Sequence, residues 1–356
     1  MRKTFVSTAL LLSVGAAALG LLLFPQEISQ TVSSTLTICT GTLLPTLFPF
    51  LILSGFLIKS GLTAQIGRIL EPLMRPLFHL PGTCASALLL GMIGGYPTGA
   101  KSVVSLYQDG LCSREEAEHA LVFCNNCGPG FLLGSIGHGV FGNLSCGILL
   151  WGCHILSAVL TGMIFADPQN SPIGPTQKRS RTYVPSPCAA LVSSVTDGMQ
   201  AFLNLSAFVL CFSALTCLIR LSGITDIFTL LLPCSGENGS FFFLGLLEMT
   251  AGTLNVTSGS TPERLILIST LVGWGGLCVH FQVLSLIQHT DLSPGPYFFG
   301  KGLHGILAGA LTACFLLGGL QFTLLVFLIV CTIVYFRKKS VEKKRNIYYN
   351  GFQEAN

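Results

Sequence analysis

Two glycine-broken stretches decide the fold of this chain: Gly91–Lys101, GMIGGYPTGAK, and Gly245–Gly259, GLLEMTAGTLNVTSG. Each follows an apolar run and carries one ionisable residue, Lys101 in the first and Glu248 in the second. Unpaired backbone groups are costly in hydrocarbon, so a break at membrane depth persists only where protein buries it or where it lines a cavity. Interrupted segments in corresponding halves are typical of a transporter's binding site. The two stretches therefore predict a membrane transporter.

The composition places the chain in a membrane. Of its 356 residues, 51% are hydrophobic and only 10% are charged, and the mean hydropathy is +0.70. A soluble domain has about 25% charged residues, so a large soluble enzyme would lack the polar surface to cover this core. The net charge is +4, with basic clusters at 178–181 and 337–345. The sequence has no cluster of basic and aromatic residues of the kind that binds nucleic acid, so we expect no nucleic-acid partner.

The reactive residue types predict neither catalysis nor a cofactor. Most of the 14 cysteines lie inside apolar runs, where cysteine packs as a small hydrophobic residue. Cys124 and Cys127 form one CxxC, but no second pair or suitably spaced histidine accompanies it, so we expect no metal site. No phosphate-binding loop, dinucleotide fingerprint or nucleophile elbow is present. We therefore expect that the protein is not an enzyme and binds no cofactor.

The N-terminus predicts a membrane anchor over residues 1–30. Its apolar run extends from Phe5 to Phe24 behind a basic start. The run exceeds the roughly 7–15 apolar residues of a signal peptide and suits the roughly 20 residues of a transmembrane helix. Retention of this helix is our expectation, and cleavage is the alternative.

The remaining apolar stretches predict an all-α polytopic membrane protein with about eight transmembrane helices and two re-entrant helical hairpins in two inverted repeats. The stretches are 36–58, 82–98, 117–141, 144–166, 199–220, 227–250, 264–288, 302–320 and 322–336. Those at 82–98 and 227–250 are interrupted, so we interpret them as the hairpins. The excess of lysine and arginine then predicts that both termini are cytoplasmic.

Five segments follow from this topology. The anchor precedes a first repeat, 31–166, with its hairpin near 82–101. A proline- and serine-rich cytoplasmic linker with an amphipathic stretch occupies 167–198. The second, inverted repeat covers 199–320, with its hairpin near 227–258, and a last transmembrane helix with a basic cytoplasmic tail covers 321–356. Inverted repeats predict a substrate site near the midplane, where the hairpins meet.

Several polar residues at membrane depth are candidates for that site. Lys101 either offers positive charge to an anionic substrate or extends to the cytoplasmic face as a flanking lysine. Glu248 lies among apolar neighbours, where a carboxylate is usually functional; it carries a proton, accepts a hydrogen bond, or pairs structurally with Lys101, Lys301 or a histidine. Asn125 and Asn126 cannot both face lipid cheaply, so one is expected to face the pore or cap a half-helix.

Four histidines lie within or beside the apolar stretches, at 138, 154, 280 and 304. None has the spacing of a metal motif. A lone histidine in a membrane more often forms a hydrogen bond between helices, and this is the role that we expect.

Three motifs resemble the sporulation integral membrane proteins that carry a nucleoside-recognition, or Gate, domain: GGYPTGAK (94–101), REEAEHALVFCNNCGPGFLLGSIG (114–137) and LLEMTAG (246–252). The resemblance spans nearly the whole chain. It implies transport of dipicolinic acid from the mother cell toward the forespore, across the outer forespore membrane of a spore-forming Firmicute. The group is similar in hairpin architecture to concentrative nucleoside transporters.

Carried over by motif, the resemblance implies a substrate-binding set of twelve residues: Gly95, Tyr96, Pro97, Gly99, Lys101, Asn125, Asn126, Gly128, Pro129, Glu248, Met249 and Thr250. The expected partners are a small anionic solute and the lipid bilayer. A transporter of nucleosides or of another small solute is the first alternative, and a sporulation membrane scaffold that transports nothing is the second.

Overall fold

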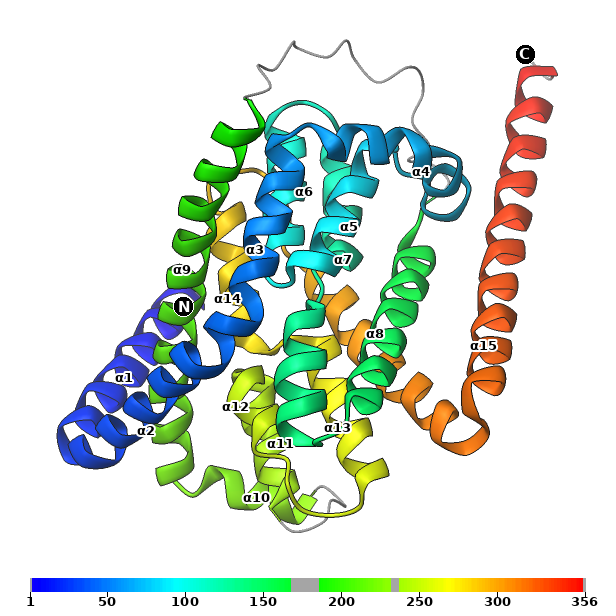
Figure 1. The fold of residues 1–356 in the computed structure, drawn as a ribbon. Helices are drawn as coiled ribbons and strands as arrows, with labels where there is room; N and C mark the ends of the chain where they lie inside the picture. Colours follow the sequence, from blue (N-terminus) through cyan, green and yellow to red (C-terminus); the bar gives the residue numbers. More distant parts are fainter. Residues whose placement is uncertain (1, 168–185, 232–236, 355–356) are drawn as a thin grey trace.

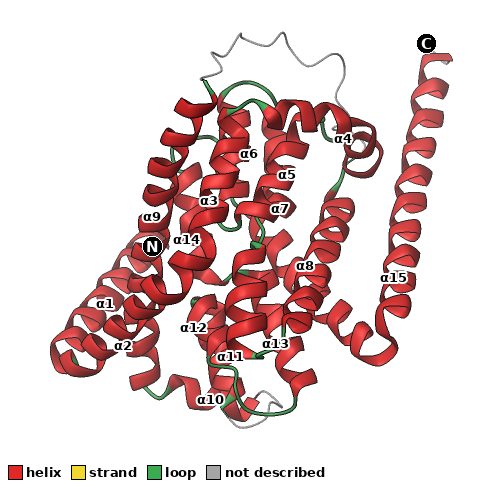
Figure 2. Cartoon of the chain, viewed as in Figure 1, coloured by secondary structure: helices red, strands yellow, loops and turns green. Residues whose placement is uncertain are grey.

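The computed structural model describes residues 2–167, 186–231 and 237–354, and Figure 2 shows that the regular elements in these ranges are helices. The basic cluster at 178–181 and most of the predicted linker lie outside the described residues. In chain order (Figure 1) the elements are α1 (Arg2–Leu23), α2 (Pro25–Ile38), the π-helix η1 (Cys39–Leu43), α3 (Leu44–Lys59), α4 (Leu62–Phe78), α5 (Thr83–Gly94), α6 (Thr98–Gln108), α7 (Arg114–Cys124), the π-helix η2 (Gly130–Val140), α8 (Leu144–Phe165), α9 (Pro187–Leu221), α10 (Ile224–Leu231), α11 (Asn238–Leu247), α12 (Met249–Leu254), α13 (Thr261–Trp274), α14 (Gly276–Ile287) and α15 (Gly295–Glu354).

Five stretches of helix in the described residues are long and apolar enough to cross a membrane: Pro25–Lys59, Leu144–Phe165, Pro187–Leu221, Thr261–Ile287 and Gly295–Lys339. A sixth is possible if Gln65–Phe78 and Thr83–Gly94, which meet at 94°, form one bent span. Shorter apolar helices cover Leu11–Leu23, Gly130–Val140 and Asn238–Leu247. The chain is a polytopic helical membrane protein, and the sequence-based count of eight crossings includes segments that this criterion leaves as short helices.

The amphipathic stretch predicted before the second repeat is the first part of a longer helix. Residues 187–221 form the single 35-residue helix α9, so the span expected at 199–220 begins twelve residues earlier. Ser186 caps this helix, its side chain accepting from the Ala189 N–H at 3.3 Å, and Pro187 occupies its first turn. Proline is favourable there because its missing N–H has no helical partner to lose.

The last apolar stretches are joined in α15, which contains one non-helical residue, Gly319, at φ 69° and ψ −168°. This break lies at the boundary predicted between 302–320 and 322–336. In Figure 1 the part of α15 beyond the break, in red, stands beside the rest of the molecule.

The two halves of the chain run through elements in the same order. Each half begins with a 35-residue helical stretch and continues with a shorter helix, a hairpin of two short helices, a broken helix and an apolar helix. The first half comprises α2–η1–α3, α4, α5–α6, α7–η2 and α8, and the second comprises α9, α10, α11–α12, α13–α14 and α15. We call α5–α6 hairpin 1 and α11–α12 hairpin 2. Figure 1 shows hairpin 1 in the upper part of the view and hairpin 2 in the lower part.

Hairpin 1 packs against α7 through glycines. A Cβ at Gly91 or at Gly99 would collide with the carbonyl oxygen of Cys124. The two arms of the hairpin therefore approach the end of α7 more closely than any other residue type permits. This packing fixes the bend of hairpin 1 beside the point where α7 stops.

Candidate functional site

Each hairpin has a tip where its helix is interrupted. In hairpin 1, α5 ends at Gly94 and α6 begins at Thr98, and Gly95 between them has φ +76°, a conformation that glycine adopts without strain. In hairpin 2, α11 ends at Leu247 and Glu248 is extended, at φ −132° and ψ 104°, before α12. We call residues 95–97 tip 1 and Glu248 tip 2.

Two other helices are interrupted at the same level. Residues 125–129, the first break, separate α7 from η2, and Gly275, the second break, separates α13 from α14. A Cβ at Gly95 would lie 2.9 Å from the amide nitrogen of Gly128, so tip 1 rests on the first break. A Cβ at Gly276 would lie 2.9 Å from the amide nitrogen of Met249, so the second break rests on tip 2. A Cβ at Gly275 would lie 3.4 Å from the Tyr96 hydroxyl, so the two pairs touch and all four interruptions meet in one region.

Tip 1, the first break and tip 2 line a single cavity, which α14 reaches just after the second break and which we call the central cavity. It contains about 440 Å³ of space free of atoms, including the part that opens outward. Its wall comes from tip 1, the first break, tip 2, α14 and the apolar faces of α3 and α9. The lining residues are Leu43, Leu47, Gly95, Tyr96, Cys127, Gly128, Phe131, Leu205, Val209, Glu248, Met249, Thr250, Cys278, Val279 and Gln282. Small-molecule sites have this composition, mostly apolar with a few polar groups.

Glu248 is held by the backbone of α12. Its two carboxylate oxygens accept from the N–H groups of Thr250 at 2.8 Å and Ala251 at 2.6 Å, and the residue is 2% exposed. The carboxylate thus caps a helix N-terminus, where backbone N–H groups favour negative charge. Among the described residues no ion pair joins Glu248 to Lys101, Lys301 or a histidine. Glu248 therefore caps α12 and does not form the structural pair with Lys101, Lys301 or a histidine that the sequence allowed as an alternative.

A buried lysine lies on the other side of tip 1. Lys301 of α15 is 0% exposed, and its ammonium donates to the Tyr96 hydroxyl at 3.1 Å, the Asn125 carbonyl oxygen at 3.0 Å and Nδ1 of His304 at 2.9 Å. An ammonium has three N–H donors, and all three are used. Each acceptor is uncharged, and none of the carboxylates that the structure describes lies within ion-pairing distance of this lysine.

Three of the four histidines gather around this lysine. His304 bonds through Nε2 to the His154 carbonyl oxygen at 3.0 Å, and the two rings lie 4.4 Å apart. His154 accepts at Nε2 from the Cys127 N–H at 3.0 Å. His280 contacts the Tyr297 hydroxyl at 3.1 Å, and that hydroxyl also accepts from Asn125 at 3.3 Å. We call this set the Lys301 cluster: Tyr96, Asn125, His154, His280, Tyr297, Lys301 and His304. His138 is exposed and lies apart, near the end of η2.

The structure separates the twelve residues that the sequence assigned to substrate binding. Six line the central cavity: Gly95, Tyr96, Gly128, Glu248, Met249 and Thr250. Asn125 belongs to the Lys301 cluster, and Asn126 donates to the Phe123 carbonyl oxygen at 2.8 Å and so caps the end of α7. Pro97 is the N-cap of α6 and Pro129 the N-cap of η2, while Gly99 packs on Cys124. Lys101 is exposed on α6 and does not line the cavity.

Sequence reasoning missed Lys301 as a member of the site. The apolar stretch of the sequence begins at residue 302, which puts Lys301 at the end of a predicted span, whereas α15 begins at Gly295 and carries Lys301 inside the helix. A signal was available, because Lys301 and His304 are three residues apart and so share one helix face. The role of His154 and His280 depends on distant residues and has no such signal.

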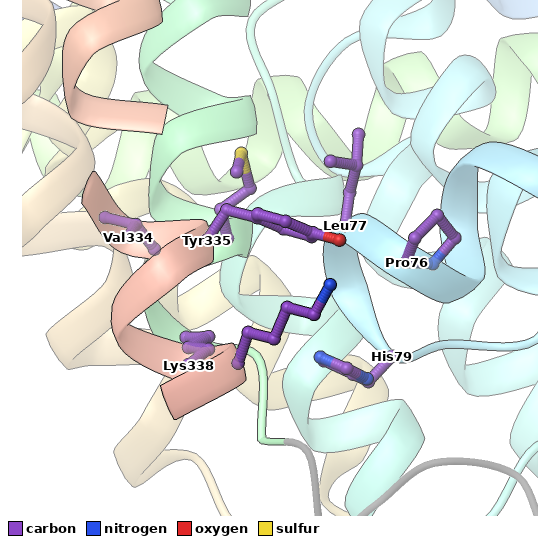
Figure 3. A pocket seen from close by; sticks show the side chains of 8 residues that line it. Pro76, Leu77, His79, Val334, Tyr335 and Lys338 are labelled. Atoms are coloured by element: carbon purple, nitrogen blue, oxygen red, sulfur yellow. The ribbon is translucent and has the colours of Figure 1, made fainter. Parts of the chain in front are cut away.

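A second pocket lies away from these interruptions. It is lined by the end of α4, by Met163 and by the far part of α15, and Figure 3 shows Pro76, Leu77 and His79 facing Val334, Tyr335 and Lys338. Lys338 donates from Nζ to the Ala166 carbonyl oxygen. Neither tip and neither break contributes to this pocket, so the central cavity is the better candidate site.

Comparisons with known proteins agree with a membrane function. Residues 40–138 match the family model described as "Gate: Nucleoside recognition". This region contains hairpin 1, the first break and most of η2. The chain is also 29% identical over 311 residues to the sporulation integral membrane protein YlbJ of Bacillus subtilis (strain 168), an alignment that covers 80% of this chain and 76% of the relative. Residues 40–138 therefore match a Gate domain model, and the chain is similar to a sporulation membrane protein along most of its length.

Proposed function

We propose that this chain, whose residues 40–138 match a Gate domain model, is a sporulation membrane transporter that moves a small anionic solute, dipicolinic acid, across the outer forespore membrane. The observation that carries the proposal is the meeting of both hairpin tips and both broken helices at one cavity. Breaks in membrane helices are tolerated where they are buried or line a path, and transporters bind their solutes at such breaks.

The proposal includes an inverted repeat. In each half, a long helix, a broken helix and an apolar helix would make three crossings, an odd number, so the second half would have the opposite orientation. Two hairpins entering from opposite sides would then bring their tips to the midplane. With the N-terminal anchor and the last helix, the topology has eight crossings and two re-entrant hairpins, with both termini cytoplasmic.

The chemistry of the region suits an anionic aromatic solute. Tyr96 and Phe131 line the central cavity, and aromatic side chains pack against rings by stacking or edge contacts. Lys301 places an unbalanced positive charge directly behind Tyr96. Dipicolinate has a pyridine ring and two carboxylates, which match these two features.

A nucleoside is the second candidate solute, because the family that matches residues 40–138 is described by nucleoside recognition. A scaffold that transports nothing is the remaining alternative. A scaffold has no need of a cavity lined by three helix interruptions.

The test is uptake into liposomes that contain the purified protein, with labelled dipicolinate and labelled uridine offered separately. We expect uptake of dipicolinate above that of empty liposomes, and a clear preference over uridine. Val209→Trp fills the central cavity from α9 and should abolish uptake, whereas Leu203→Trp on the exposed side of the same helix should not. Uridine uptake alone would identify a nucleoside transporter, and uptake of neither solute would refute the proposal.

A further inference from the structure

Lys301 poses an electrostatic problem that the proposed function does not by itself solve. A charged side chain within a membrane is costly and normally pairs with an opposite charge. A buried ion without such a partner is strongly unfavourable. Lys301 is 0% exposed and its three donors reach a hydroxyl, a carbonyl and an imidazole. The ammonium is well hydrogen-bonded, but its charge is not balanced by the described residues around it.

The elements packed around Lys301 contribute ionisable groups, but none is a carboxylate. Tip 1 contributes Tyr96 and the first break contributes Cys127. Helix α8 contributes His154, α14 contributes His280, and α15 itself contributes Tyr297 and His304. Residues 265–274 of α13, the helix that packs most extensively on α15, contain no ionisable side chain. On α7, Glu116 and Glu118 lie near the start of the helix, where they bond to Ser113, Arg114 and Ser293.

We propose that Lys301 is the proton-binding site that couples solute movement to proton movement. The lysine carries its proton while an anionic solute occupies the central cavity and gives it up when the solute leaves. This inference rests on the proposed function, since it requires an anion in that cavity.

Two residues, Tyr96 and Cys127, connect the central cavity to the Lys301 cluster and so couple the solute to the proton. Tyr96 lines the central cavity and accepts from Lys301, and Cys127 lines the cavity and donates its N–H to His154. A carboxylate in the cavity would thus lie one side chain away from the ammonium. In a poorly polarisable interior the attraction between the two charges is large, so each stabilises the other. By linkage, the anion then raises the affinity for the proton by the same factor as the proton raises the affinity for the anion.

The tautomer of His304 makes this residue an acceptor for Lys301 but not an exit for the proton. Its Nε2 bonds to the backbone carbonyl of His154, so Nε2 carries the hydrogen and Nδ1 is free to accept from Lys301. His304 is 0% exposed and both its nitrogens are hydrogen-bonded to protein, whereas Tyr96 lines the central cavity. When the solute leaves and water fills the cavity, an N–H bond of Lys301 breaks, its electron pair stays on Nζ, and the proton bonds to the Tyr96 hydroxyl oxygen, whose own proton passes to a water molecule. The products are a neutral amine, a neutral tyrosine and a hydronium ion. The cycle therefore moves solute and proton in the same direction.

The experiment uses liposomes that contain the full chain, dipicolinate and a trapped pH-sensitive dye. An inward dipicolinate gradient should acidify the interior of wild-type vesicles. Lys301→Arg keeps a positive charge that does not dissociate, so it should retain dipicolinate exchange but lose acidification. Lys301→Met removes the charge and should weaken dipicolinate binding on the order of 100-fold. Lys59→Arg, a conservative change in a surface ion pair with Asp197, is the control and should behave as wild type.

A second measurement covers the case in which arginine does not fit the buried site. Titration calorimetry of dipicolinate in buffers of different ionisation enthalpy reports protons taken up on binding by the wild-type protein, with Lys301→Met as comparison. Proton uptake should be present in the wild type and absent in the variant. Wild-type exchange without proton movement, or normal acidification by Lys301→Met, would refute the role of Lys301 alone. Absence of dipicolinate exchange in the wild type would refute the proposed function.

Discussion

The ammonium of Lys301 donates a hydrogen bond to the hydroxyl of Tyr96 at 3.1 Å, although the two residues are 205 positions apart. Tyr96 in turn donates to the backbone carbonyl of Val272 at 2.9 Å, so this one hydroxyl joins tip 1 to α13 as well as to α15. The bond connects the tip of hairpin 1 to the second half of the chain. Any movement of hairpin 1 relative to α15 must break or rebuild it.

Replacement of Glu248 should separate capping from proton transfer. Glu248→Ala leaves the buried N–H of Thr250 and the partly buried N–H of Ala251 unpaired. An unpaired buried donor costs about 1–3 kcal/mol, so we expect a clear drop in the melting temperature of the detergent-solubilised protein. Glu248→Gln retains one carbonyl acceptor and should be less harmful. If the glutamine variant instead keeps wild-type stability and solute exchange but loses accumulation against a gradient, Glu248 carries the coupling proton, which is one of the three roles predicted for it from the sequence.

Lys101→Ala tests the two interpretations of the lysine at the start of α6. Because Lys101 is exposed and does not line the central cavity, we expect the variant to retain most of the wild-type dipicolinate uptake. Uptake is measured at equal protein content, with the amount of folded protein checked by size-exclusion chromatography. Loss of uptake in a folded variant would restore Lys101 as a charge partner of the solute.

The packing of hairpin 1 on α7 predicts a strong response to one methyl group. Gly91→Ala places a Cβ against the Cys124 carbonyl oxygen, and overpacking of this kind typically costs about 1–3 kcal/mol. The matched control is Gly41→Ala, where an added Cβ meets nothing within 4 Å. Thermal unfolding in detergent should show a lower melting temperature for the first variant and little change for the second. Equal melting temperatures would contradict the close approach.

A hydrogen bond outside the membrane-spanning helices predicts a pH effect. The Tyr107 hydroxyl donates to Asp291 Oδ1 at 2.5 Å, and this bond lowers the pKa of that carboxyl below its ordinary value. A carboxyl whose pKa is lowered by folding stabilises the folded state above its unfolded pKa, and the contribution disappears as the pH falls through the folded pKa. Tyr107→Phe should therefore be slightly less stable than wild type at pH 7, and the difference should vanish in acid. A stability difference between wild type and variant that grows at acid pH would contradict the predicted direction of the effect.

The proposed inverted repeat predicts opposite accessibility for two single cysteines. Lys178→Cys lies outside the described residues in the linker predicted to be cytoplasmic, and Thr257→Cys replaces an exposed residue just after hairpin 2. Both are introduced after replacement of the reactive native cysteines, such as the exposed Cys188 and Cys211. A membrane-impermeant reagent should label them from opposite sides. Labelling of both from one side would exclude the topology.

The sequence by itself determined where helices form and where they fail. Apolar runs of spanning length fix the membrane helices, and local chemistry fixes the interruptions: Gly95 needs a positive φ, and Glu248 accepts from the N–H groups that follow it. These interactions involve residues only a few positions apart, so they can be predicted from the local sequence. Six of the twelve residues that the motifs indicated accordingly line the central cavity.

The tertiary structure decided which polar residues meet. Lys301 reaches Tyr96 and Asn125, and His304 reaches His154, across separations of 150 to 205 positions. No periodicity encodes such contacts, because they depend on how α8, α15 and the two interruptions pack in space. The same packing left Lys101 on the surface and buried Lys301, although the two lysines have similar sequence surroundings, each in or beside an apolar segment. Burial, which sets the cost of a charge, is a property of the assembled helices and not of either segment alone.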